Sequence, residues 1–380
     1  MKEVKTTLDS LIIGMFVSRL DKPWIESPFL LEGIRIKSQE DIDSLRGHTE
    51  YVYVDIDEGP APSSDQSDFN PISNDNVKND FSSSFLVQND NISEYEKLKK
   101  VVYKIKTSFK DELTNAKQIK QRVETSFKNL LDNINKDEEL NIDELKQDVR
   151  ATIDSILRNP SAFDLLAQLE KTNEYAYGHA LSTSIWCAHF GRYLGLDKSE
   201  IEELALGGML LDLGKVKIPS ELLNKTSDLS LSERMKLQQH VDLGVSKLTN
   251  IKDLSPNVLN MVATHHERAN GKGYPKRIKN DEIPIYGRIA GIVDSYDAMT
   301  TDRPYGKTYS PNEAITEIYK LRGSEFDTEL VEKFIKTIGL YPTGSLVELN
   351  TGAVAIVLEI NEKKRLFPTV LIVTDQNKHA

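Results

Sequence analysis

Histidine and aspartate side chains in the second half of the chain have the types and spacing that could hold a metal ion. Four of the seven histidines and two aspartates form this set: His179, His240, His265, His266, Asp212 and Asp294. Imidazole and carboxylate groups are ligands that suit Mn, Fe and Zn. The elements that carry these residues must therefore bring them to one place.

Asp212 is expected at the inner face of a helix. The run Ser199–Glu202 has the pattern of a capping box and predicts where that helix begins. Steps of three and four residues then place Asp212 on the same face as the apolar or small residues Ile201, Leu204, Ala205 and Gly208. A carboxylate on a face that packs inward must be paired or bound to a metal.

Two further segments repeat this pattern. Asp294 shares a predicted helix face with the small residues Gly287, Ala290 and Gly291, and His265 and His266 follow an apolar stripe that includes Val258 and Val262. A single buried histidine or aspartate is more often a hydrogen-bonded structural residue. Several such groups on successive helices favour a shared site, whereas His48, His189 and His379 are background.

The composition limits the classes of function. The 380 residues carry 48 Lys and Arg against 59 Asp and Glu, a net charge of −11, which argues against a general binder of nucleic acids or anionic membranes. The single Cys187 excludes an intramolecular disulfide framework and fits a reducing compartment. The apolar run at 11–17 is too short for a membrane span and does not resemble a secretory signal, so we expect a cytoplasmic protein.

The pattern along the chain predicts five segments. They are a small α+β module at 1–58, a flexible linker at 59–92, a helical connector at 93–158, a helical domain at 159–341 and C-terminal β-strands at 342–376. In the module, strands are predicted at 11–13 and 51–54, with a helix that Ser38 caps. Three strands are predicted at 347–349, 354–360 and 368–373.

The connector has the apolar periodicity of a long amphipathic helix. Its stripe is predicted to run from Tyr95 through Leu98, Val102, Ile105 and Phe109 to Ile134, and a second helix is predicted from about residue 141. Two interpretations stay open for this pair of helices. They form either a hairpin that packs on the next domain of the same chain or a surface for homodimerisation.

Local motifs indicate a family. The run from His265 to Arg268, followed by Gly271-Lys272-Gly273-Tyr274-Pro275, resembles the HHE…GYP signature of HD-GYP domains. Asp294-Ser-Tyr-Asp-Ala-Met-Thr and the later Arg303-Pro304-Tyr305 resemble the segment that follows it, and residues 207–215 lie where the family has its HD-x-GK motif. Residues 14–31 also resemble the small domain of unassigned function that often precedes HD-GYP domains.

The resemblance implies a mainly α fold, the helical HD superfamily, and metal-dependent hydrolysis of cyclic di-GMP to pGpG or GMP. In the family pattern His179, Asp212 and Asp294 belong to one Fe or Mn ion, and His240, His265 and His266, with Asp212 bridging, belong to the other. Lys215 is the cation near the phosphate, and the other substrate contacts fall at Tyr274, Arg303 and Lys307. Glu174 matches a ligand of a third metal in some members.

One position departs from the family pattern. Leu211 stands where the HD motif has its histidine, and leucine has no lone pair to offer a metal. Loss of a ligand weakens binding at the first metal position, so the chain could bind one ion instead of two. Two interpretations follow: a weakened phosphodiesterase, or an inactive domain that acts as a cyclic di-GMP sensor or a module that binds a signalling protein.

Overall fold

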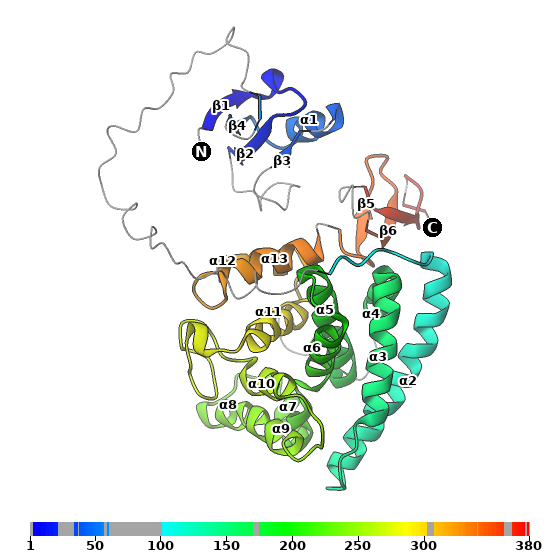
Figure 1. Cartoon of the computed structure of the whole chain (residues 1–380), viewed down its shortest axis with the longest axis vertical. Coiled ribbons are helices and arrows are strands. Elements are labelled where there is room, and N and C mark those ends of the chain that lie inside the picture. The colour runs from blue at the N-terminus through cyan, green and yellow to red at the C-terminus, as the bar shows by residue number, and fades with distance from the viewer. Residues whose placement is uncertain are drawn as a thin grey trace, which may run out of the picture. The chain divides into compact units, whose positions relative to one another are not determined.

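The structure, a computed structural model, describes residues 3–21, 34–36, 38–56, 59–60, 101–169, 175–301, 308–339, 341–360, 367–376 and 378–379. The chain divides into two compact units, 1–94 and 95–380 (Figure 1). The predicted linker at 59–92 lies outside the described residues except for Gly59 and Pro60.

The first unit contains a four-stranded antiparallel sheet and one helix (Figure 1). Its elements are β1 (Glu3–Thr7), the 3-10 turn η1 (Leu8–Ser10), β2 (Phe16–Leu20), β3 (Ile34–Arg35), α1 (Gln39–Arg46) and β4 (Tyr51–Asp55), with strand order β1-β4-β2-β3. The predicted start of α1 is confirmed, because the Ser38 backbone N–H donates to the Asp41 carboxylate at 2.9 Å in a capping box.

The strand predicted at 11–13 is wrong. These residues form a turn between η1 and β2, in which Ile12 and Ile13 are exposed. The Met15 N–H donates to the Ile12 carbonyl at 3.3 Å, and Gly14 has a φ of +102°, in the region that favours glycine. The strand that follows this turn is Phe16–Leu20, which pairs with β4.

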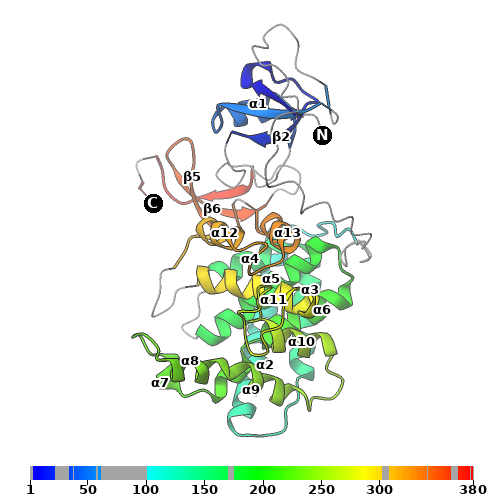
Figure 2. The same ribbon diagram turned by 90° about the vertical axis from the view of Figure 1, so that its left-hand side faces the viewer.

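The second unit is a helical bundle followed by a small sheet (Figures 1 and 2). Its helices are α2 (Phe109–Asn135), α3 (Asp143–Arg158), α4 (Pro160–Leu169), α5 (Tyr175–Leu194), α6 (Lys198–Leu210), η4 (Leu213–Lys217), α7 (Ser220–Leu223), α8 (Leu231–Gln238), α9 (His240–Leu248), α10 (Pro256–Thr264), η5 (Asn280–Glu282), α11 (Ile285–Thr300), α12 (Pro311–Lys320) and α13 (Thr328–Ile338). The antiparallel sheet β5-β6-β7 consists of β5 (Leu346–Glu348), β6 (Val354–Glu359) and β7 (Thr369–Ile372), which confirms the predicted C-terminal β-element.

The long helix α2 begins later than the periodicity predicts. Ser108 is its N-cap, and the Ser108 hydroxyl accepts a hydrogen bond from the Asp111 backbone N–H. Val102 and Ile105 therefore lie in a non-helical segment before the helix, where both side chains are exposed. Tyr95 and Leu98 lie outside the described residues.

Helices α2 and α3 form an antiparallel hairpin that packs on α4, α5 and α6 of the same chain (Figure 1). The apolar stripe of α2 is buried in this contact: Ala116, Ile119, Val123, Phe127, Leu130 and Ile134. Burial of such a stripe is the main source of stability for an amphipathic helix. The stripe is thus used within the chain.

Helices α5, α6, α10 and α11 pack together and carry or adjoin the predicted ligands. The α6 capping box lies two residues earlier than predicted, with Asp197 as N-cap and Glu200 as its partner, so α6 begins at Lys198. Small residues permit two close contacts. A Cβ on Gly214 would lie 1.9 Å from the His240 carbonyl oxygen, and one on Gly291 would lie 3.0 Å from that of His265.

Among the described residues, no helix combines the length and apolar character that crossing a bilayer requires.

Candidate metal centre

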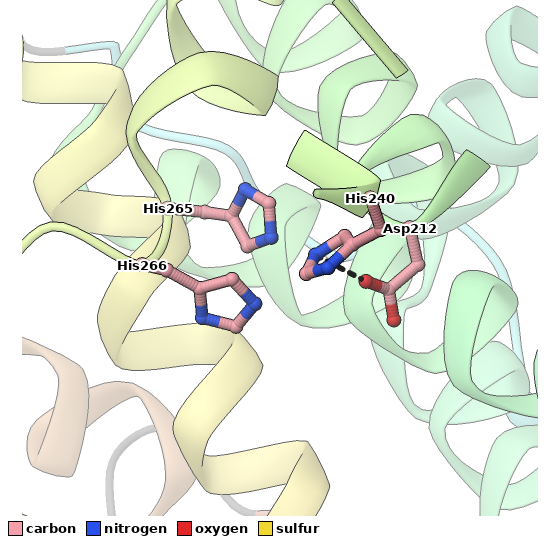
Figure 3. A group of neighbouring side chains, drawn as sticks. All are labelled: Asp212, His240, His265 and His266. Carbon is pink, nitrogen blue, oxygen red and sulfur yellow. Dashed lines mark ion pairs between the residues drawn. The ribbon is translucent and has the colours of Figure 1, made fainter. Parts of the chain in front are cut away.

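Four predicted ligands converge in the helical unit. Figure 3 shows the imidazole rings of His240, His265 and His266 and the Asp212 carboxylate pointing toward a common space. One ligand atom from each residue lies within 4.8 Å of the others. Asp212 follows α6, His240 opens α9, and His265 and His266 follow the last residue of α10, so three separate elements build the group.

Backbone carbonyls orient two of these rings. The Nδ1 atom of His240 donates to the Leu237 carbonyl at 2.8 Å, and that of His265 donates to the Val262 carbonyl at 2.8 Å. Each ring then presents Nε2 with a lone pair, which is the arrangement found in histidines that bind metals. Three buried atoms, His240 Nε2, His265 Nε2 and Asp212 Oδ1, have no hydrogen-bond partner among the described residues, although His240 Nε2 and Asp212 Oδ1 lie 3.3 Å apart as an ion pair (Figure 3). Because an unpaired buried polar atom is costly, this donor set fits a metal ion.

A second group shares Asp212. The Nε2 atom of His179 lies 3.3 Å from Asp212 Oδ2 and 3.1 Å from Asp294 Oδ1, and these three residues form another possible metal site. Leu211 is buried beside Asp212 in sequence but supplies no ligand atom. This second group therefore has one donor fewer than the first.

The protonation states of the two groups differ. Burial lowers the pKa of His240, brings that of His265 to about 4, and together with His265 lowers that of His266 well below its usual value. These rings are neutral and ready to bind a metal.

His179 behaves in the opposite way. Burial alone would lower its pKa, but hydrogen bonds to Asp212, Asp294 and Asp297 raise it well above the usual value. Burial likewise opposes ionisation of Asp212 and Asp294, yet Lys215 and His179 hold the pKa of Asp212 low, and His179 and His266 hold that of Asp294 low. A metal ion in this second group must displace the proton on His179.

Lys215 lies at the shared carboxylate. Its Nζ atom is 2.5 Å from Asp212 Oδ2, and its side chain is about one-third exposed toward the pocket. The resemblance to HD-GYP domains predicts Lys215 near the phosphate, and its charge lies beside the Asp212 carboxylate. A phosphate group that binds next to Asp212 would therefore find the Lys215 ammonium group already in position.

The GYP loop packs directly on the first group. The Tyr274 ring stacks on the His266 ring with centroids 4.5 Å apart and an interplanar angle of 28°. The Tyr274 N–H donates to the His266 carbonyl at 3.1 Å. Gly273 allows this approach, because a Cβ there would lie 2.5 Å from the same carbonyl oxygen. The loop thereby fixes the position of the His266 ring, and its Tyr274 ring also lies 6.4 Å from the His240 ring.

Two buried carboxylates lie within the recognised motifs but were not predicted as site residues. Asp297 lies 2.6 Å from His179 Nδ1 and also accepts a hydrogen bond from the Ser182 hydroxyl. Glu267 accepts hydrogen bonds from the Lys276 and Arg277 N–H groups at 2.7 and 3.0 Å and so shapes the loop that carries Tyr274. The available signal was spacing: Asp297 lies three residues after Asp294 on one helix face, and Glu267 directly follows the paired histidines.

The other predictions have different outcomes. Glu174, Arg303 and Lys307 lie outside the described residues. His189 lies apart from both groups and pairs with Asp164, whose Oδ1 is 2.7 Å from His189 Nε2.

A pocket of about 980 Å³ adjoins both ligand groups and is lined by five of the predicted ligands, His179, Asp212, His240, His266 and Asp294.

Comparison with known proteins places this site in a family. Residues 164–330 match the family model described as HD domain, and all six predicted ligands fall within this range. The chain contains an HD domain. Residues 3–145 match a second model, a domain of unknown function (DUF3391), which extends from the first unit through the α2 helix. Together these matches confirm the resemblance to HD-GYP proteins that the motifs indicated.

Three curated relatives are similar to parts of this chain. A cyclic di-GMP phosphodiesterase of Pseudomonas aeruginosa is 34% identical over 218 residues, which cover 57% of this chain and 52% of the relative. A cyclic di-GMP phosphodiesterase of Thermotoga maritima is 34% identical over 182 residues, covering 46% of this chain and 49% of the relative. A 3′3′-cGAMP-specific phosphodiesterase of Vibrio cholerae is 32% identical over 175 residues, covering 46% and 34%.

The chain spans about half the length of the relatives from Pseudomonas aeruginosa and Thermotoga maritima, and about a third of the length of the relative from Vibrio cholerae. A solved structure shares its fold. Bd1817, an HDG"Y"P protein from Bdellovibrio bacteriovorus, aligns with a TM-score of 0.52 and 16% identity over 88% of this chain and 99% of Bd1817. The mainly helical HD-GYP fold expected from the motifs is thus confirmed.

Proposed function

We propose that the chain is a metal-dependent phosphodiesterase that hydrolyses cyclic di-GMP to pGpG. The observation that carries this proposal is the group of Asp212, His240, His265 and His266, whose ligand atoms lie within 4.8 Å of one another beside the pocket. The named activity of the relatives from Pseudomonas aeruginosa and Thermotoga maritima supports the choice of substrate. The relative that acts on 3′3′-cGAMP widens the substrate class to cyclic dinucleotides.

The resemblance to HD-GYP domains favours Fe or Mn, with one ion held at the four-residue group. His179, Asp212 and Asp294 would hold a second ion more weakly, because Leu211 supplies no donor. A divalent ion bound here lowers the pKa of water to make a nucleophile and stabilises charge that develops on the phosphodiester. The third position proposed for some family members would need Glu174.

The chain's own residues have separate roles in this proposal. Lys215 neutralises the phosphodiester beside Asp212, and Tyr274 keeps His266 in place and forms part of the pocket wall. Arg303 and Lys307 are proposed contacts to the nucleotide. Because the pocket adjoins both ligand groups, substrate bound in it has its phosphodiester next to the Asp212 carboxylate and the Lys215 ammonium group.

Leu211 favours a second candidate function. If the weaker ion is essential for chemistry, the HD domain binds cyclic di-GMP without hydrolysing it and acts as a sensor or as a partner of a signalling protein. The other expectations belong to the same proposal: a regulatory first unit, a cytoplasmic location and a homodimer formed through residues 93–158. Since the apolar stripe of α2 is buried within the chain, such a dimer would use other faces of this hairpin.

The test is cyclic di-GMP turnover by protein purified without oxygen and loaded with Mn or Fe, with products separated by chromatography. Wild type, Leu211→His and Asp212→Ala are compared, and His48→Gln, an exposed histidine of the first unit, is the control. Wild-type pGpG formation that Asp212→Ala abolishes supports the enzyme. Activity in Leu211→His alone supports the sensor. If wild type and Leu211→His both lack activity and neither retains metal, both candidate functions are wrong.

A further inference from the structure

The pocket extends from the metal centre to α7 and α8. Besides the ligands, it is lined by Asn224 after α7 and by Arg234 and Gln238 on α8. Arg234 and Gln238 are four residues apart on one helix, so their side chains lie on the same face. None of these polar residues belongs to either ligand group.

Arg234 differs from the neighbouring cations. Lys215 is paired with Asp212, Lys225 is 2.7 Å from Glu233, and the Arg268 guanidinium donates to the carbonyls of His265 and Glu267. The guanidinium of Arg234 has no ion pair or hydrogen bond with the described residues. It is an exposed, permanently charged fork on the pocket wall.

The proposed substrate requires contacts far from the metal. A cyclic dinucleotide has two bases and two phosphodiesters, and only one phosphodiester is at the metal centre. The volume of about 980 Å³ lies at the upper end of the range for ligand pockets, so it has room for more than the reacting nucleotide. The second half of the ligand must therefore contact another part of the lining.

The chemistry of this part of the lining suits a purine better than a phosphate. Apolar side chains of Leu131, Val216 and Leu223 share the pocket with Arg234, and such surface favours a base but not a phosphate. An arginine fork matches the O6 and N7 acceptors of guanine in a bidentate manner, whereas glutamine amides pair more readily with adenine.

We propose that Arg234 binds the guanine base of the nucleotide that is not being hydrolysed and so selects guanine-containing cyclic dinucleotides. This inference rests on the proposed function, because it requires a cyclic dinucleotide in the pocket. Arg234 is a specificity residue, since it lies on α8, away from the metal ligands.

The experiment measures direct binding by calorimetry to the full metal-loaded chain. The ligands are phosphorothioate analogues of cyclic di-GMP, 3′3′-cGAMP and cyclic di-AMP, which resist hydrolysis. The variants are Arg234→Ala, Arg234→Lys and a matched control, Lys236→Ala, which removes an exposed cation of the same helix that does not line the pocket. Circular dichroism confirms that each variant is folded.

We expect Arg234→Ala to weaken cyclic di-GMP binding about 10- to 100-fold and to reduce the preference over cyclic di-AMP by a similar factor. Arg234→Lys should lose most of that preference although it keeps the charge, and Lys236→Ala should match wild type. Wild-type affinity and preference in Arg234→Lys would instead indicate a phosphate contact and overturn the inference. Unchanged binding in Arg234→Ala would also overturn it. If wild type and Lys236→Ala bind none of the three ligands, the proposed function itself fails.

Discussion

The His179 Nδ1 atom lies 2.6 Å from the Asp297 carboxylate, which is buried behind the ligand group. Asp297 also accepts hydrogen bonds from the hydroxyls of Ser182 and Thr301. With Nδ1 held by Asp297, the His179 ring turns Nε2 toward Asp212 and Asp294. This is the arrangement by which a carboxylate fixes the orientation of a histidine ligand.

Asp297→Asn is therefore expected to weaken metal binding at the group of His179, Asp212 and Asp294 by about 10- to 100-fold. The measurement is metal content and affinity by mass spectrometry and chelator competition. Asp281→Asn, which changes a carboxylate that is 99% exposed, is the control. Equal metal affinity in Asp297→Asn and wild type would show that the contact has no influence on the ligand.

Leu211→His should raise the metal content from about one ion to about two ions per chain, because it adds a donor to the weaker group. Leu211→Met is the matched control, since methionine is similar in size and is a poor ligand for Fe or Mn. If the methionine variant gains as much metal as the histidine variant, the effect does not come from a new ligand.

Removal of the Tyr274 ring should disturb His266. We expect Tyr274→Ala to weaken metal binding by about threefold to tenfold, as loss of one aromatic stack would predict, while Tyr274→Phe keeps the ring and binds metal like wild type. Titration of the apoprotein with Mn measures this difference. A loss of the same size in Tyr274→Phe would assign the effect to the hydroxyl group and not to stacking.

The contact between the start of α2 and the end of α3 should make the stability of the fold depend on pH. Burial alone would raise the pKa of Glu112, but hydrogen bonds from Arg158 at 2.7 and 2.8 Å and from Ser155 at 2.6 Å lower it from 4.5 to about 2. The ionised form is thus favoured by folding. Its contribution is fully present above pH 4.5 and is lost as the pH falls through about 2.

Glu112→Gln should therefore lower the free energy of unfolding at pH 7 by at most about 3 kcal/mol, and the difference from wild type should shrink between pH 4.5 and 2. Urea unfolding across this range measures it. Glu124→Gln, which removes a partly exposed partner of Lys128 on the same helix, should change stability by less than about 1 kcal/mol. A constant difference across the range would rule out this titration.

Helical periodicity predicted the positions of the site residues better than it predicted where the helices begin. Asp212 and Asp294 were predicted on inward faces because each shares its face with small and apolar residues at steps of three and four. The structure brings both carboxylates to His179. Their role in metal binding stays a prediction. The start of α2 was misplaced because Val102 and Ile105 continue the apolar period into an extended segment, which periodicity alone does not distinguish from a helix.

Contacts between distant segments could not be predicted in this way. Asp297 lies 118 residues from His179, and Arg234 reaches the pocket through the packing of α7, α8 and α9. No local pattern encodes such distances, because they depend on how each helix crosses its neighbours. Sequence motifs supplied the residue types, and the tertiary packing supplied their partners.

The hairpin contributes to the pocket as well as to stability. Phe127 and Leu131 of α2 are part of the pocket lining, and the Phe127 ring lies 6.0 Å from that of the buried Tyr177 on α5. Both α2 residues precede the HD domain match at 164–330. A fragment cut at that family boundary would lack the α2 residues that line the pocket, so a fragment that keeps the whole lining must begin before α2.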